Sequence, residues 1–281
     1  MDPRVALLKE YYRGLPKDRV KVEIHRHGFD YLDSMLSDGM RLEYGELTLS
    51  GLLHKYKFAG VTEQRLDQLL LSHVEKTCNV CLYFGAPKSG LFCFNLDNNH
   101  KVNNTELIPE IELTVRALRD RLAALGCEPL VIASGRGYHL WGRLSEAVEN
   151  ERLYDFMLRA AVQAMVAMHK RGGYDYRRIK FNFYPDPRTR DTVSLRLFGS
   201  EHAKNRVFSR VLTPEGLLDE AASWGHFERH MADHTIAPET FEEAFRAISP
   251  EDPAPARPPT AVLSARLGDW VRSLNRPPRD G

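Results

Sequence analysis

The chain has 281 residues, of which 43% are hydrophobic and 27% charged, and its formal net charge is +1. A chain of this length and composition buries a core of its own, so we exclude an intrinsically disordered protein. No apolar run approaches the roughly 20 residues that span a bilayer, and the start Met1-Asp-Pro-Arg4 is not typical of a signal peptide. We therefore expect a cytoplasmic protein with no membrane partner.

The residues before Cys81 predict an accessory layer and carry no chemical motif. Ala6 to Tyr12 and Gln64 to Val74 have the pattern of helices, and Val20 to His25 has the pattern of a strand. We therefore assign residues 1–80 to an N-terminal α/β layer.

Two cysteines at the end of this region and just after it are possible zinc ligands. Cys78 and Cys81 have the spacing of zinc ligands, and His73 and Cys93 are the nearest further candidates. No second pair of this spacing completes a tetrahedral set. We expect reduced thiols and no zinc site.

The segment Leu91 to Asp97 predicts a strand with two oxygen-bearing side chains side by side. Asn95 and Asp97 occupy alternate positions and therefore point to the same face. Mg²⁺ and Mn²⁺ take carboxylate oxygens, water and substrate phosphates as ligands. We take Asp191 as the candidate for a further carboxylate, so the predicted metal site consists of Asn95, Asp97 and Asp191.

A glycine turn follows a predicted helix from Ile108 to Leu125 and a strand from Leu130 to Ala133. In Ser134-Gly-Arg136-Gly137-Tyr-His139, the backbone N–H groups of the turn and Arg136 can meet phosphate oxygens. His139 lies just inside the next strand, from which it can donate to a triphosphate. The alternative is a glycine hairpin with a half-buried histidine.

The remaining elements of this half are a strand, a helix and two further strands. The ranges are Tyr138 to Arg143, Leu153 to Met168, Ile179 to Tyr184 and Thr192 to Leu197. The order strand, helix, strand, strand, helix, strand is that of an RRM-like α+β unit. We expect the motif residues to converge on an open face of its sheet, with helices on the opposite face.

Basic and aromatic residues alternate between Tyr174 and Tyr184. Such a strand offers phosphate contacts and stacking surfaces to single-stranded DNA. The alternative is a strand with buried phenylalanines and a solvated basic face. The candidate nucleic-acid-binding residues are Arg177, Arg178, Lys180 and Tyr184.

The C-terminal part predicts helices from Pro214 to Trp224 and from Pro238 to Ile248. Residues 249–261 form a proline-rich linker, and residues 262–281 form a short amphipathic tail. The tail either packs on the chain's own core or docks on a replication partner such as a helicase.

The three motifs, in this order, resemble the archaeo-eukaryotic primase superfamily, which includes small catalytic primase subunits and primase-polymerases. The resemblance covers about Leu82 to Arg210, and its third motif runs from Asp191 to Lys204. It implies that Asp97 and Asp191 hold divalent metal and that Ser134, Arg136, Gly137 and His139 form the nucleotide site. It also implies that the same pocket is lined by Arg196, Ser200, His202 and Lys204.

The resemblance implies a fold as well as a site. The primase-polymerase fold would occupy residues 1–212, with residues 81–212 as the RRM-like catalytic core. Residues 213–248 would be a helical extension.

One position departs from the family pattern, because Asn95 stands where the first motif has an acid. An amide oxygen is a neutral, weaker ligand for a hard cation, so the site has one negative charge fewer. Three explanations stay open: a deliberate acid-to-amide change, a naturally degenerate binding module, or a site that works with fewer carboxylates. We favour the first because the other motif residues are intact.

The predicted function is that of a template-directed primase or primase-polymerase. It would transfer a nucleotide from an NTP or dNTP to a 3′-hydroxyl on a single-stranded DNA template, by a two-metal mechanism with Mg²⁺ or Mn²⁺. The alternative is a catalytically silent module that binds nucleotide or single-stranded nucleic acid in a replication or defence assembly. A third interpretation is a metal-dependent nuclease that uses the same acidic residues, but the phosphate-binding residues of the second and third motifs argue for a triphosphate.

Overall fold

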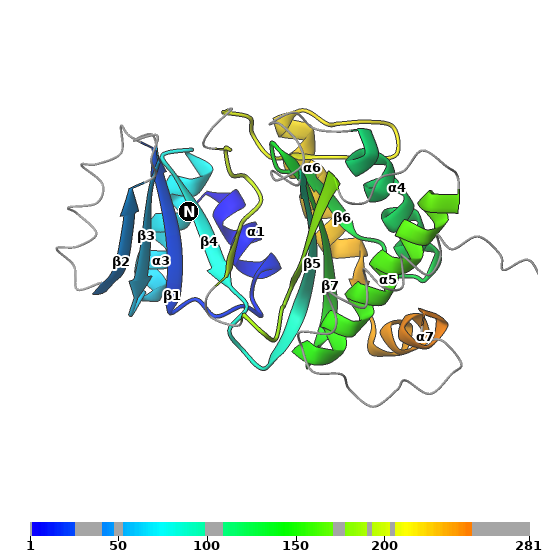
Figure 1. The fold of residues 1–281 in the computed structure, drawn as a ribbon. Coiled ribbons are helices and arrows are strands. Elements are labelled where there is room, and N and C mark those ends of the chain that lie inside the picture. Colours follow the sequence, from blue (N-terminus) through cyan, green and yellow to red (C-terminus); the bar gives the residue numbers. More distant parts are fainter. Residues whose placement is uncertain are drawn as a thin grey trace, which may run out of the picture. The chain divides into compact units, whose positions relative to one another are not determined.

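The computed structural model describes residues 2–25, 41–47, 53–98, 109–170, 178–189, 193–202 and 206–248 (Figure 1). Residues 1–248 form one compact unit, and residues 249–281, which contain the predicted linker and tail, form another that lies outside the described residues. Arg177, Asp191 and Lys204 also lie outside them. Among the described helices, none combines the length and the apolar character needed to cross a membrane.

The first sheet is antiparallel and has the order β2-β3-β1-β4-β9. Its strands are β1 (Arg19–His25), β2 (Arg41–Leu47), β3 (Leu53–Ala59), β4 (Cys78–Tyr83) and β9 (Ser194–Arg196). Val20 and Val22 on β1 are fully buried in one core cluster with residues of α1 (Pro3–Tyr11) and α3 (Glu63–Val74). Because side chains alternate along a strand, Lys21 and Glu23 face the other way.

The second sheet has the order β10-β6-β7-β5-β8. Its strands are β5 (Lys88–Asn98), β6 (Leu130–Ala133), β7 (Gly137–Glu149), β8 (Ile179–Tyr184) and β10 (Arg210–Val211), and β11 (Thr235–Ile236) pairs with β7 in parallel. With α4 (Pro109–Ala124) and α5 (Asn150–Lys170), the elements from β5 to β8 follow the predicted order of strands and helices. The fold is therefore mixed α/β, and apart from the β11–β7 pair its described strand pairings are antiparallel.

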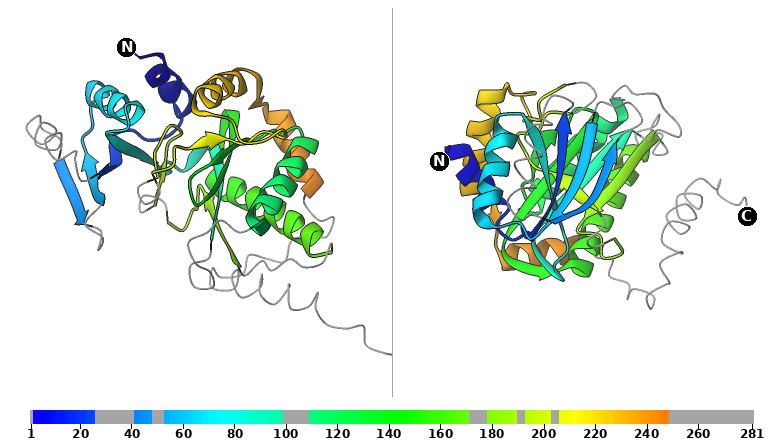
Figure 2. Two further views of the ribbon diagram at one scale, coloured as in Figure 1. Left: turned by 90° about the horizontal axis from the view of Figure 1, so that it is seen from above. Right: turned by 90° about the vertical axis from the view of Figure 1, so that its left-hand side faces the viewer.

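Strand β5 separates an apolar layer from a polar one. Phe92, Phe94 and Leu96 are fully buried, in one cluster with residues of α4 and α5. Burial of each such side chain stabilises the fold by about 1.5–3 kcal/mol. Asn95 and Asp97 therefore point to the opposite face of the sheet, away from the helices, which Figure 1 and Figure 2 show along one side of β5 and β7.

The sequence led us to expect that the face carrying Asn95 and Asp97 is open. In the structure, part of this face is covered. The rings of Tyr11 and Tyr12 pack edge-on against Trp141 of β7, with centroids 6.4 Å and 5.2 Å away. The residues before Cys81 also contribute strands β2 and β3, which the sequence analysis did not predict. The strands of the N-terminal layer therefore form a separate sheet together with β4 and β9.

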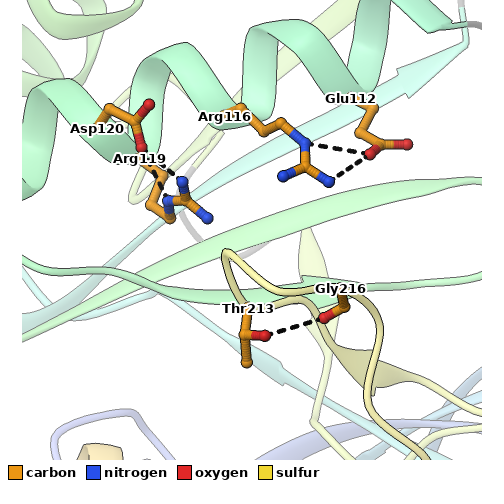
Figure 3. A network of polar contacts seen from close by, with 6 residues as sticks. All are labelled: Glu112, Arg116, Arg119, Asp120, Thr213 and Gly216. Atoms are coloured by element: carbon orange, nitrogen blue, oxygen red, sulfur yellow. Dashed lines mark hydrogen bonds and ion pairs between the residues drawn. The ribbon is translucent and has the colours of Figure 1, made fainter.

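The C-terminal helices are α6 (Glu220–Asp233) and α7 (Pro238–Ile248). The prediction of a helix from Pro214 was wrong for its first turns, because Thr213 to Gly216 forms a turn in which the Thr213 hydroxyl donates to the Gly216 carbonyl (3.1 Å). The helix begins where the Asp219 carboxylate accepts from the N–H of Ala222 (2.8 Å). Figure 3 shows this turn together with two ion pairs on α4, Glu112 with Arg116 and Arg119 with Asp120.

Candidate active site

A cleft of about 150 Å³ lies between the two sheets. We call its two sides the first-sheet wall and the second-sheet wall. The first-sheet wall consists of Lys21, Glu23, Cys81 and Arg196, and the second-sheet wall consists of Asn95, Asp97, Ser134, Arg136, His139 and Tyr184. His202, Ser194 and Leu195 complete the lining.

The cleft brings together most of the predicted site residues that the structure describes. The exceptions are Gly137, Ser200, Arg178 and Lys180, which are not among the lining residues. Ser200 is buried, and its carbonyl accepts from the N–H of Ser209 (2.8 Å). The residues that sequence reasoning missed are Lys21, Glu23 and Cys81. The alternation of valine and charge in Val20-Lys21-Val22-Glu23 is a pattern that indicates a strand with one polar face.

Asn95 and Asp97 are linked to each other on the cleft side of β5. The amide nitrogen of Asn95 donates to Oδ2 of Asp97 (3.3 Å). Because a carboxylate only accepts, this bond fixes the amide so that its oxygen is the free end. Oδ1 of Asn95 is buried and accepts no hydrogen bond within the described part of the chain.

This pair fits part of a site for Mg²⁺ or Mn²⁺. It offers a carboxylate and an unsatisfied amide oxygen, and Mg²⁺ commonly takes one or two carboxylates together with water and substrate phosphates. Within the described residues there is no cluster of three Asp, Glu, His or Cys side chains that could hold a metal alone. A third protein ligand would therefore have to come from elsewhere, and Asp191 stays the prediction.

The turn between β6 and β7 is closed by a hydrogen bond from the N–H of Ser134 to the carbonyl of Gly137 (2.8 Å). Gly135 has a φ of 100°, which favours glycine. A Cβ atom on Gly137 would lie 2.0 Å from the carbonyl oxygen of Leu96 and 2.7 Å from Oδ1 of Asp97. The glycine at 137 therefore allows β7 to approach β5 beside the Asp97 carboxylate.

His139 is a neutral histidine at the floor of the cleft. It lies opposite Asn95 in the pairing of β5 with β7 and is 6% exposed. Burial, with a smaller contribution from the charge of Arg196, lowers the pKa of His139 to about 3. At neutral pH the imidazole can therefore donate one hydrogen bond without carrying a charge.

The first-sheet wall is a row of side chains across three neighbouring strands. Lys21 pairs with Cys81 across β1 and β4, and Cys81 pairs with Arg196 across β4 and β9. Nζ of Lys21 lies 3.0 Å from Oε1 of Glu23. Burial alone would raise the pKa of the Glu23 carboxyl, but the charges of Lys21 and Arg196 outweigh it and hold the pKa below its usual value.

Two buried side chains fix the loop that follows β9. Nε2 of His73 lies 2.8 Å from the carbonyl of Phe198, and its Nδ1 accepts from the N–H of Val80 (3.0 Å). Asn79 makes two bonds to the backbone of Glu201, one from its amide nitrogen (2.8 Å) and one to its amide oxygen (3.0 Å). The lining residue His202 is therefore anchored to β4.

These contacts also bear on the possible zinc ligands. Both ring nitrogens of His73 bond to the backbone, so His73 has no ring nitrogen left for a metal. Cys78 and Cys81 lie three positions apart on β4 and therefore point to opposite faces. All four cysteines of the chain are buried and free.

The predicted nucleic-acid-binding residues are separated in the structure. Arg178 forms an ion pair with Glu110 of α4. Lys180 is exposed and lies opposite Asp97 in the pairing of β5 with β8, so it is on the same face of the sheet as Asp97. Tyr184 lines the cleft, and burial is the main reason that its pKa rises to about 12.

The cleft favours an anionic ligand. Among its described lining residues, Lys21, Arg136 and Arg196 are cations, and Glu23 and Asp97 are carboxylates. Three positive charges against two negative ones, next to a neutral histidine, give a local excess of one positive charge. A narrow cleft focuses such a potential.

No protein-family model and no curated protein matches the chain. Among solved structures, the polymerase domain of Mycobacterium tuberculosis Ligase D in complex with DNA aligns with 15% identity and a TM-score of 0.45. That alignment covers 87% of this chain and 86% of the other. The AEP domain of the cyanophage S-2L primase-polymerase aligns with 12% identity and a TM-score of 0.37, over 82% and 97% of the two chains. Both of these proteins are named as polymerases.

Proposed function

We propose that this chain is a template-directed nucleotidyltransferase of the primase or primase-polymerase type. It would transfer a nucleotide from an NTP or dNTP to a 3′-hydroxyl on a single-stranded DNA template. The observation that supports this best is the convergence of the Asn95 and Asp97 pair with Arg136, His139 and Arg196 in one cleft. These residues come from three strands and a turn that lie up to about a hundred positions apart.

The residues of the second-sheet wall divide into two roles. Asp97, the amide oxygen of Asn95 and, from the motif resemblance, Asp191 would hold Mg²⁺ or Mn²⁺. When bound, such an ion activates the attacking hydroxyl and neutralises charge on the transferred phosphoryl group. Arg136 and His139 would bind the phosphates, where fixed donors in a narrow site are most effective.

The catalytic domain would comprise residues 1–212, and residues 213–248 would be a helical extension. The strand order β6-β7-β5-β8, with two helices on one face, supports an RRM-like core within residues 81–212. Lys180 lies on the face of this sheet that carries Asp97, at a position where it could contact the template backbone. Arg177, Ser200, Lys204 and a partner for the C-terminal tail stay part of the proposal through the motif resemblance and the sequence pattern.

The test is nucleotide incorporation on a single-stranded DNA template, with and without a primer, in Mg²⁺ and in Mn²⁺. The chain is compared with its Asn95→Asp variant, and Asp97→Asn in the Asn95→Asp background is the negative control. We expect Asn95→Asp to raise incorporation at least about a hundredfold, because a second carboxylate restores the charge that holds the metals. Incorporation that survives Asp97→Asn would contradict the proposed metal site.

A second function, a silent nucleotide-binding module, has one observation in its favour. The Asn95 amide donates to the Asp97 carboxylate and so occupies one of its oxygens. A charge-assisted bond of this kind competes with metal for that oxygen. Nucleotide and template binding without incorporation in either the unsubstituted chain or Asn95→Asp would favour this function.

A further inference from the structure

The first-sheet wall contains an ionic group that the proposed function does not yet use. Lys21, Cys81 and Arg196 form one cross-strand row that faces the second-sheet wall. Glu23 lies two positions beyond Lys21 on the same face of β1, and its carboxylate is 3.0 Å from the Lys21 ammonium. All four side chains line the cleft.

Both members of this ion pair are largely withdrawn from water. The side chain of Lys21 is 20% exposed and that of Glu23 is 10% exposed. Ion pairs on the surface differ from this one: Lys88 and Glu149 are also 3.0 Å apart, but their side chains are 58% and 54% exposed. A buried carboxylate is costly to keep unless it has a partner, so the pair fixes where the ammonium lies.

We propose that Glu23 is a positioning residue that holds Lys21 toward the phosphates of a nucleoside triphosphate, with Lys21 as a direct phosphate ligand beside Arg196. This inference rests on the proposed function for the identity of the ligand. It assigns the triphosphate to the space between the two walls. The cations of the first-sheet wall would then face Arg136 and His139 across the ligand.

A positioning role for Glu23 and a simple charge effect predict opposite changes in the affinity for an anion when the Glu23 charge is removed. Removal of the Glu23 charge makes the cleft more positive, so Coulomb attraction alone would tighten the binding of an anion. If Glu23 positions the Lys21 ammonium, removal of the Glu23 carboxylate weakens binding, because Lys21 no longer points at the ligand. The direction of the change therefore separates the two explanations.

The experiment measures binding of inorganic tripolyphosphate and of a nucleoside triphosphate to the full chain by calorimetry. We expect Glu23→Gln to weaken both about tenfold and Lys21→Gln to weaken both by a similar factor, since each loses charge-assisted contacts. The same Glu23→Gln change should lower the affinity less in the Lys21→Gln background than in the unsubstituted chain. Lys88→Gln and Glu149→Gln are the matched controls and should change neither affinity.

Thermal unfolding identifies variants that fail to fold, and Glu23→Asp, which keeps the charge, should recover part of the affinity if Glu23→Gln proves unstable. The inference is overturned if tripolyphosphate does not bind the unsubstituted chain, or if it binds Glu23→Gln equally or more tightly. Loss of binding in Glu23→Gln and Lys21→Gln, without any nucleotide incorporation in the unsubstituted chain or in Asn95→Asp, supports the inference and overturns the proposed function. Nucleotide incorporation by Asn95→Asp, together with unchanged binding of tripolyphosphate to Glu23→Gln, supports the proposed function and overturns the inference.

Discussion

The two walls of the cleft are built in different ways. In the second-sheet wall, Asn95 and Asp97 lie two positions apart on one strand, and Ser134, Arg136 and His139 share one hairpin. In the first-sheet wall, Lys21, Cys81 and Arg196 come from three strands that span more than half of the chain. The first kind of wall is visible as short motifs, whereas the second exists only after the strands have paired.

The walls also differ in charge. The second-sheet wall has one carboxylate, one amide and one guanidinium next to the neutral His139. The first-sheet wall has two cations, of which Lys21 forms an ion pair with Glu23. The second-sheet wall would therefore suit a metal with its ligands, and the first-sheet wall would suit phosphate oxygens.

Acidification is expected to have the largest effect on the framework behind both walls. Burial lowers the pKa of His73 to about 4 and those of His139 and His230 to about 3, so the unfolded chain takes up protons near pH 6.5 while the folded chain does not. Stability is therefore complete above about pH 6.5 and falls as the pH drops toward 3–4, by up to about 1.4 kcal/mol per pH unit for each group. The free energy of unfolding, measured in urea from pH 7.5 to 4.5, checks this.

Two variants assign that loss to the two sides of the cleft. His73 fixes the loop behind the first-sheet wall, and His139 belongs to the second-sheet wall. His73→Gln and His139→Gln should each flatten the dependence of stability on pH, whatever they cost at neutral pH. Equal stability of the unsubstituted chain at pH 7.5 and pH 4.5 would contradict the prediction.

The next largest effect is expected at the contact between β5 and β7. Gly137→Ala places a methyl group 2.0 Å from the Leu96 carbonyl oxygen and 2.7 Å from Oδ1 of Asp97. We expect it to lower the free energy of unfolding by about 1–3 kcal/mol and to displace the Asp97 carboxylate. Urea unfolding measures the first effect, and Mn²⁺ binding in the Asn95→Asp background measures the second.

The control for this change is Gly90→Ala. Gly90 lies on the same strand as Asp97, but its Cβ atom would be 3.6 Å from the nearest other atom, an ordinary contact. The Gly90→Ala variant should unfold at nearly the same urea concentration as the unsubstituted chain. Equal effects at both glycines would show that the close approach at Gly137 does not decide the geometry of the site.

The smallest effect is expected for Lys180, which is exposed beside the second-sheet wall. Lys180→Gln removes one cation and should lower the slope of log affinity against log salt for single-stranded DNA by about 0.7. Arg178→Gln should change the slope less, because Arg178 already pairs with Glu110. Fluorescence anisotropy at several salt concentrations measures both slopes, and a larger change for Arg178 would reverse the assignment.

Much of the second sheet could be predicted because its elements have local causes. The spacing of Ile111, Val115, Leu118 and Leu122 predicts α4, and these residues are buried against the sheet. The run Leu130 to Ala133 coincides with β6. The helix expected from Pro214 failed because the Thr213 turn and the Asp219 cap, both local, delay its start to Glu220.

The first sheet could not be predicted in the same way. Strands β2 and β3 lie on one side of β1, and β9 pairs with β4 more than a hundred positions away. Pairing of this kind depends on which strands meet after the chain collapses, and no periodicity within a strand encodes its partner. Lys21 and Glu23 were therefore not among the predicted site residues.

By itself, the sequence determined which side chains of β5 share a face, where the glycine turn lies and which half of the chain carries the motifs, because alternation and turn chemistry are local properties. Tertiary packing alone places Arg196 in the same cleft as His139, brings Lys21 and Glu23 to its border and makes Gly137 the residue that leaves room for Asp97. Each of these depends on close packing between segments that are remote in the chain, where the distances are set by the assembled sheets.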